Sequence, residues 1–123
     1  MSKRGVIDRY EGDVGFDFER NLVKVMGDPD CLFIISSCIK SASFVQEISR
    51  RHAIPIAVCY RKVNNLVEMG ILNRTGHIIS PRGKRIYQYR AVLENTTLQF
   101  LDNRVEVSFR FRTGETKRFQ LKD

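Results

Sequence analysis

The stretch Ser41–Tyr89, SASFVQEISRRHAIPIAVCYRKVNNLVEMGILNRTGHIISPRGKRIYQY, decides the fold of this 123-residue chain. Pro55 is unsuited to a helix interior, so it separates one short helix from a second that follows it. Gly70 stands where a left-handed helix end is expected, and Ser80–Gly83 has the composition of a turn. The stretch therefore predicts two short helices joined by a tight turn and followed by a β-hairpin.

The second of these helices, at about residues 56–69, has two different faces. Apolar residues at helical spacing are expected to face inward. They are Ile56, Cys59, Val63, Leu66 and Val67. The residues left facing outward are Ala57, Val58, Tyr60, Arg61 and Asn64. That outer surface suits the groove of a nucleic acid.

Capping signals predict where the preceding helices begin. Asp28 can cap a helix with Pro29 in its first turn, and this helix should run to about residue 40. Ser43 and Gln46 fit a capping box, in which the serine hydroxyl accepts an amide and the glutamine reaches back. Residues 16–26 form either a short amphipathic helix or an extended arm, because periodicity does not distinguish the two.

The C-terminal part alternates apolar and polar residues in three segments, 97–101, 104–112 and 116–121, which predicts an antiparallel β-meander. The predicted class is α+β: a three-helix core with a hairpin wing, followed by this meander. Three parts are expected. Residues 1–27 are an arm or short helix, and 1–15 are a flexible lead. Residues 28–92 are the helical domain, and 93–123 are the β-extension. The first and last parts are candidates for dimerisation or ligand sensing.

Composition favours a polyanionic partner. The net charge is +7 and the pI about 9.7, and basic residues that contact phosphates release condensed counterions. A soluble basic protein without such a partner has the same composition. No apolar run approaches the roughly 20 residues that span a bilayer, and the N-terminus lacks a signal-like stretch. A cytoplasmic protein with no membrane partner is expected.

A helix-turn-helix with a basic hairpin predicts insertion of the second helix into the major groove of double-stranded DNA. Tyr60, Arg61 and Asn64 are expected to read bases. Phosphate contacts are expected from Lys62, Arg82, Lys84 and Arg85, with Lys40 and Ser43 as weaker candidates and Arg74 and His77 along the hairpin. The alternative interpretation is a generic three-helix bundle whose outer face and basic loop are merely solvated.

The three cysteines, Cys31, Cys38 and Cys59, are expected to be reduced and buried as small hydrophobic residues. A thiol sensor or soft-metal site is the alternative, although no neighbouring Cys or His completes a ligand set. We expect neither a metal nor a cofactor. The chain also lacks a nucleophile elbow, a phosphate-binding glycine loop and a metalloprotease motif, so an enzyme is not expected.

Several segments are similar to archaeal winged-helix regulators of the ArsR-like superfamily, over about residues 28–91. They are FVQEI at 44–48, IPI at 54–56, CYR at 59–61, VNNL at 63–66, EMGIL at 68–72, SPRGKR at 80–85 and YR at 89–90. The resemblance implies a transcription factor, usually a homodimer. In such a protein the helix at about residues 56–69 is the recognition helix and the hairpin is the wing. This chain departs from the pattern at Ala57, where serine or threonine is common, and it lacks the paired-cysteine metal box.

Two other functions fit the same residues. A winged-helix module of the transcription machinery that docks proteins would present large apolar residues on the outer helix face. Val58 and Tyr60 favour that reading, whereas Arg61, Lys62 and Asn64 disfavour it. The second alternative function is a sensor of a ligand or of thiol oxidation, with a pocket in the β-tail. RNA binding also stays open, although no aromatic sheet motif is visible.

Overall fold

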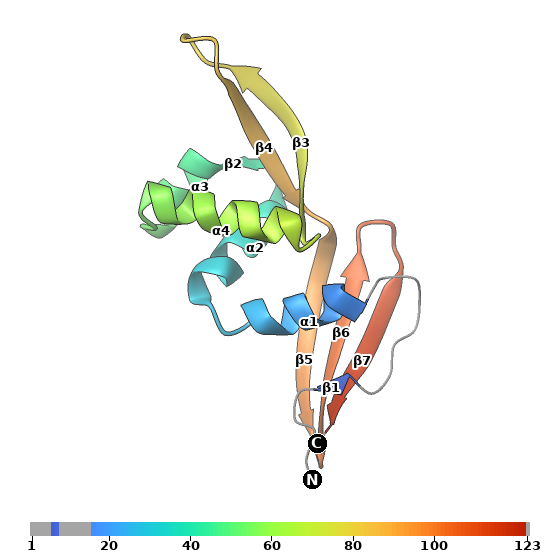
Figure 1. The fold of residues 1–123 in the computed structure, drawn as a ribbon. Coiled ribbons are helices and arrows are strands. Elements are labelled where there is room, and N and C mark those ends of the chain that lie inside the picture. Colours follow the sequence, from blue (N-terminus) through green and yellow to red (C-terminus); the bar gives the residue numbers. More distant parts are fainter. Residues whose placement is uncertain (1–5, 8–15, 123) are drawn as a thin grey trace. The chain divides into compact units, whose positions relative to one another are not determined.

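The computed structural model describes residues 6–7 and 16–122, which form an α+β structure of four helices and two small antiparallel sheets (Figure 1). The helices are α1 (Phe16–Val25), α2 (Pro29–Lys40), α3 (Val45–His52) and α4 (Ile56–Glu68). The strands are β1 (Val6–Ile7), β2 (Ser43–Phe44), β3 (Leu72–Ile79), β4 (Arg85–Ala91), β5 (Leu93–Leu101), β6 (Arg104–Phe111) and β7 (Thr116–Lys122). The predicted α+β class is confirmed.

The chain folds as two compact units. Residues 21–92 form the first, which we call the helical unit. Residues 1–20 and 93–123 form the second, which we call the sheet unit. The N-terminal part and the β-tail thus belong to the same unit, although they lie at opposite ends of the sequence.

Helix α2 begins and ends where the sequence predicts. The Asp28 carboxylate accepts hydrogen bonds from the backbone N–H groups of Asp30, at 3.0 Å, and Cys31, at 3.4 Å. Pro29 occupies the first turn, where a missing N–H costs nothing. These two residues fix the start of a helix whose buried side includes Ile34 and Cys38.

The capping box predicted at Ser43 and Gln46 is wrong by one residue. Ser43 lies in β2, opposite Tyr89 of β4, so the helix starts later and Phe44 occupies the cap position. The Phe44 N–H donates to the Glu47 carboxylate at 2.9 Å. Because a phenylalanine side chain has no acceptor, only this half of the reciprocal pair exists. Gln46 remains exposed on the helix surface.

Helix α4 buries one face, as predicted, with one exception. Cys59, Val63 and Leu66 are fully buried, whereas Ile56 in the first turn is 45% exposed. The predicted inward position of Ile56 is therefore wrong: the first turn of α4 leaves this side chain largely in solvent. The helix ends as expected, since Gly70 adopts a left-handed φ of 82° and the Ile71 N–H donates to the Leu66 carbonyl.

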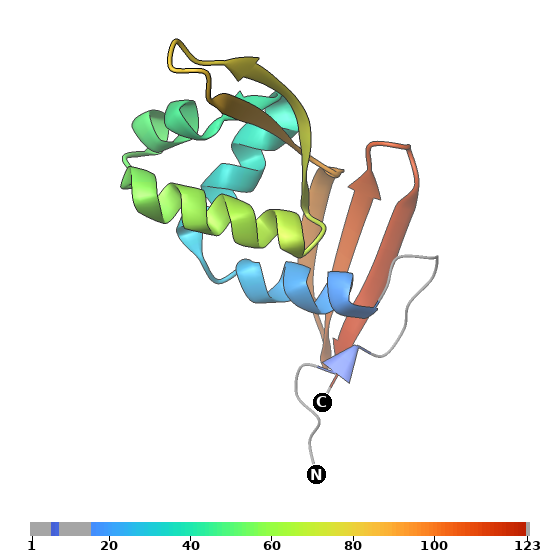
Figure 2. The same cartoon turned by 45° about the horizontal axis from the view of Figure 1, so that its top comes forward.

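The small sheet of the helical unit has the strand order β2-β4-β3, and its β3–β4 hairpin projects beyond the helices of that unit (Figure 1 and Figure 2). The predicted turn at residues 80–83 is confirmed: the Gly83 N–H donates to the Ser80 carbonyl, and Gly83 has a φ of 81°. Gly76 lies within β3 next to a bulge that follows Arg74. A bulge tolerates glycine without ending the strand.

The sheet unit contains the predicted meander, with strand order β1-β7-β6-β5. The first strand of the meander, β5, starts at Leu93, four residues before the predicted start. Along β6, buried and more exposed residues alternate as the sequence pattern predicts. Val107 and Phe109 are buried, while Arg110 is exposed. Strand β1 pairs with β7, so residues 6–7 of the predicted flexible lead are a strand, and the rest of that lead lies outside the described residues. Residues 16–25 are a helix, not an arm.

Glu19 of α1 is the only charged side chain among the described residues that is fully buried. Neither of its carboxylate oxygens has a hydrogen-bond partner. Desolvation raises the pKa of Glu19 from 4.5 to about 7, because burial penalises the charged form. The neighbouring Phe18 lies 5.6 Å, ring to ring, from both Phe109 and Phe111, so this part of α1 packs on the apolar sheet face.

Glu19→Gln should change how stability depends on pH. The folded protein holds a proton on Glu19 that the unfolded chain releases above pH 4.5, so the contribution of Glu19 to wild-type stability falls between about pH 4.5 and 7 and stays low above that. The neutral variant lacks this loss and should be more stable at pH 8 by about 2–3 kcal/mol. Urea unfolding across the pH range measures it. Parallel pH curves for the two proteins would contradict the burial of an ionisable carboxyl here.

Candidate nucleic-acid interface

The net positive charge of this protein belongs to one of its two units. The helical unit contains eleven Lys and Arg against four Asp and Glu, which makes its net charge +7, the value for the whole chain. The sheet unit contains ten of each and is neutral. Of the four carboxylates in the helical unit, Glu47 caps α3, and Asp28 and Asp30 lie at the start of α2. A polyanion would therefore be drawn to the helical unit.

The outer face of α4 is open to solvent. Ala57, Tyr60, Arg61 and Asn64 are exposed, and Val58 is half-buried. The Tyr60 hydroxyl accepts a hydrogen bond at 2.9 Å from the Gln46 side-chain amide, which ties α4 to the first turn of α3. The structure thus brings four of the five predicted outer residues to one accessible surface, opposite the buried Cys59, Val63 and Leu66.

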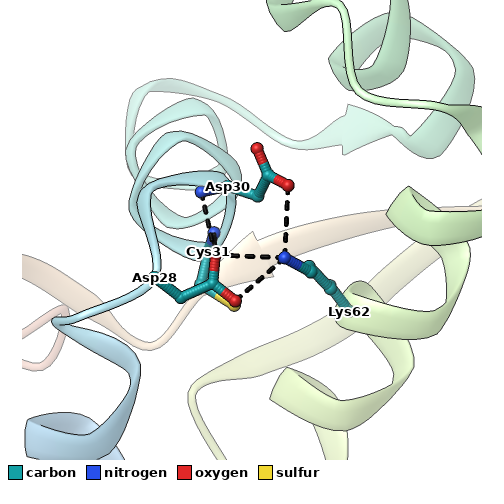
Figure 3. Close-up of polar contacts among 4 residues, drawn as sticks. All are labelled: Asp28, Asp30, Cys31 and Lys62. Carbon is teal, nitrogen blue, oxygen red and sulfur yellow. Dashed lines mark hydrogen bonds and ion pairs between the residues drawn. The ribbon is translucent and has the colours of Figure 1, made fainter.

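Lys62 does not point outward with them. Its ammonium group lies 2.9 Å from the Asp28 carboxylate and 3.1 Å from that of Asp30, and its side chain is only 19% exposed (Figure 3). The hydrogen bond with Lys62 lowers the pKa of Asp28 and raises that of Lys62. Lys62 therefore joins α4 to the start of α2, and its role as a phosphate contact stays a prediction that requires these ion pairs to open.

The turn of the β3–β4 hairpin presents the cations predicted there. Arg82, Lys84 and Arg85 are all exposed, and no salt bridge involves them within the described part of the chain. Farther down the hairpin, the Arg74 guanidinium lies 4.4 Å from the centre of the Tyr87 ring, and His77 stacks obliquely beside the same ring. Cation–π contact of this kind orients Arg74 without neutralising it.

The structure separates the two weaker phosphate candidates. Lys40 is exposed at the end of α2, whereas Ser43 is buried and its hydroxyl donates to the Ser41 carbonyl at 3.0 Å. Ser43 therefore presents no exposed hydroxyl to a phosphate. Arg50 and Arg51, which the sequence reading missed, are exposed in the last turn of α3. Their adjacency at a helix end was the available signal.

The cysteines behave as apolar core residues. All three are free and buried, and desolvation raises the pKa of Cys31 to about 11 and of Cys38 to about 12. Thiols with such values are almost wholly protonated near neutral pH and are poor nucleophiles. Among residues 6–7 and 16–122, no cluster of three His, Cys, Asp or Glu side chains could hold a metal ion. A cavity of about 270 Å³ opens beside Cys31, Lys62 and Arg61.

Comparison with protein-family models finds none that matches this chain, and comparison with curated proteins finds no match either. The resemblance to ArsR-like regulators therefore stays a prediction, and the candidate interface rests on charge and geometry. None of the helices within residues 16–122 is long and apolar enough to cross a bilayer.

Asp28 both caps α2 and pairs with Lys62, and two substitutions separate these roles. Asp28→Ala removes the cap and should destabilise the protein by about 1 kcal/mol, whereas Asp28→Asn keeps a capping oxygen and should cost less. The lowered pKa of Asp28 contributes stability that is present above its unfolded value of 3.8 and is lost as the pH falls below it. Thermal unfolding at pH 7 and pH 3 should therefore show a smaller acid loss for Asp28→Asn. Equal stabilities of both variants would argue against the cap.

Proposed function

We propose that residues 28–92 form a winged helix that binds double-stranded DNA, and that the protein regulates transcription as a homodimer. The order of elements supports the proposal, because α2, β2, α3 and α4 precede the β3–β4 hairpin and β2 adds a short third strand to it. In this arrangement α4 is the recognition helix and the hairpin is the wing.

One observation carries the proposal: the open face of α4, with Tyr60, Arg61 and Asn64, belongs to the unit that holds the entire net charge. A helix with such side chains fits the major groove, where arginine can bond guanine and asparagine can bond adenine. The exposed Arg82, Lys84 and Arg85 of the hairpin are suited to phosphates, as are Arg50 and Arg51 at the end of α3. We assign base recognition to α4 and general affinity to the other cations.

The proposal predicts that Arg61→Ala relaxes base preference. A bidentate contact to guanine is worth about 1–3 kcal/mol of discrimination, so the preferred duplex should lose affinity by that amount while unrelated duplexes lose little. Selection from random duplexes at fixed salt, followed by anisotropy titrations, measures both effects. Arg118→Ala removes an equally charged, exposed side chain from the sheet unit and is the control. An unchanged selection profile would remove Arg61 from the recognition set.

The wing makes a different prediction. Lys84→Ala combined with Arg85→Ala should weaken binding to all duplexes alike and should reduce the slope of log affinity against log salt by up to about two. The paired control, Arg104→Ala with Arg118→Ala, removes the same charge from exposed positions of the sheet unit. If both double variants keep the wild-type slope, the hairpin does not touch phosphate.

A protein-docking module is the second candidate, favoured by one observation. Ile56 and Tyr60 lie one turn apart on α4, and both are large, partly apolar side chains exposed to solvent. Such a pair suits an apolar partner surface. The duplex selection separates the two functions, because a docking module would bind random duplexes weakly and enrich no sequence.

A further inference from the structure

Strand β5 forms an open edge of the larger sheet. In the order β1-β7-β6-β5 it pairs only with β6, so one side of its backbone has no strand partner among the described residues. From Asn95 to Leu101 the pairing with β6 is regular, without a bulge. An edge of this length presents a row of N–H and C=O groups that can bind another strand.

From Asn95 to Leu101, no side chain of β5 carries a charge that would block such pairing. Natural edge strands are commonly protected by lysine, proline or an inward charge, and β5 has no Lys, Arg or Pro along its nine residues. Its face that continues the apolar side of the sheet instead carries Leu98, 40% exposed, and Phe100, 81% exposed. An exposed apolar edge of this kind is a pairing site or an aggregation hazard.

We propose that β5 pairs antiparallel with β5 of a second copy of this chain, with Leu98 opposite its own counterpart. This register uses the whole regular segment, residues 95–101, and places each Phe100 across from Thr96 of the other copy. The two-fold axis stands perpendicular to the sheet, so Leu98 and Phe100 of both copies gather on the same face. Cross-strand pairs of aromatic and aliphatic residues stabilise such an interface.

Charge supports a second copy as the occupant. The sheet unit is neutral, with ten basic and ten acidic residues, so two sheet units meet without net repulsion. Two helical units would each bring +7. The inference deepens the proposed function, because it names the interface of the proposed homodimer, and it is tested without DNA.

The mass of the full chain in solution tests the interface. Wild type should be a dimer by light scattering or sedimentation, and Leu98→Lys with Phe100→Lys should raise the dimer dissociation constant by about tenfold or more, since the apolar pairs are lost and like charges face each other. Leu32→Lys is the matched control, because Leu32 of α2 is 43% exposed and lies in the other unit. It should leave the dimer intact.

Cross-linking tests the register independently of any loss of stability. Residues directly opposite in an antiparallel pair have Cα atoms about 4.5–5.5 Å apart, within the range of a disulfide. Leu98→Cys should therefore form a covalent dimer under mild oxidation and Leu32→Cys should not, while the three native cysteines, which are buried, do not compete.

Three results would overturn the inference. They are a monomeric wild type, a dimer that survives the double lysine substitution, and cross-linking at Leu98→Cys no faster than at Leu32→Cys. Failure of the proposed function is recognised separately: a β5 dimer that binds no duplex refutes DNA binding and leaves the interface standing. A monomer that binds duplexes refutes the β5 interface and the homodimer, and it leaves DNA binding standing.

Discussion

Helix α4 has to bury Cys59, Val63 and Leu66 in the core of the helical unit, and this constraint decides which of its other side chains can meet a partner. Burial of three fully enclosed side chains fixes the rotation of the helix about its axis. Tyr60, Arg61 and Asn64 then face solvent as a geometric consequence. Lys62 is next to Arg61 in sequence, yet it turns toward α2 and pairs with Asp28 and Asp30. Neighbouring cations on one helix thus have different roles, one structural and one available to a ligand.

The division of charge between the two units gives each a separate physical character. The helical unit carries the whole positive excess, so its interactions with polyanions are long-ranged and sensitive to salt. The sheet unit has balanced charge, and its exposed large apolar side chains include Leu98 and Phe100 of the edge strand β5. Contacts made there are short-ranged and depend little on ionic strength. One chain therefore offers two surfaces that respond to different solution conditions.

Local chemistry made most of the fold predictable. Asp28 and Pro29 mark the start of α2, Gly70 ends α4, and residues 80–83 form a turn, because each depends on the backbone preferences of a few adjacent residues. Errors arose where a distant segment intervened. Ser43 lies in a strand because it pairs with Tyr89 of β4. Lys62 forms an ion pair with Asp28, which is 34 residues away in the sequence. The sequence pattern does not predict these long-range contacts. It also does not predict that Glu19 is buried without a hydrogen-bond partner.

The hydrogen bond between Gln46 and Tyr60 has a consequence for molecular recognition. It holds an aromatic side chain in one orientation on an otherwise open surface, so part of the conformational entropy that a flexible ring would lose on association is already lost in the free protein. The hydroxyl keeps its own proton to donate, because its oxygen is the acceptor in this bond. A ligand at α4 therefore encounters a pre-set hydrogen-bond donor, which favours geometric selectivity over adaptability.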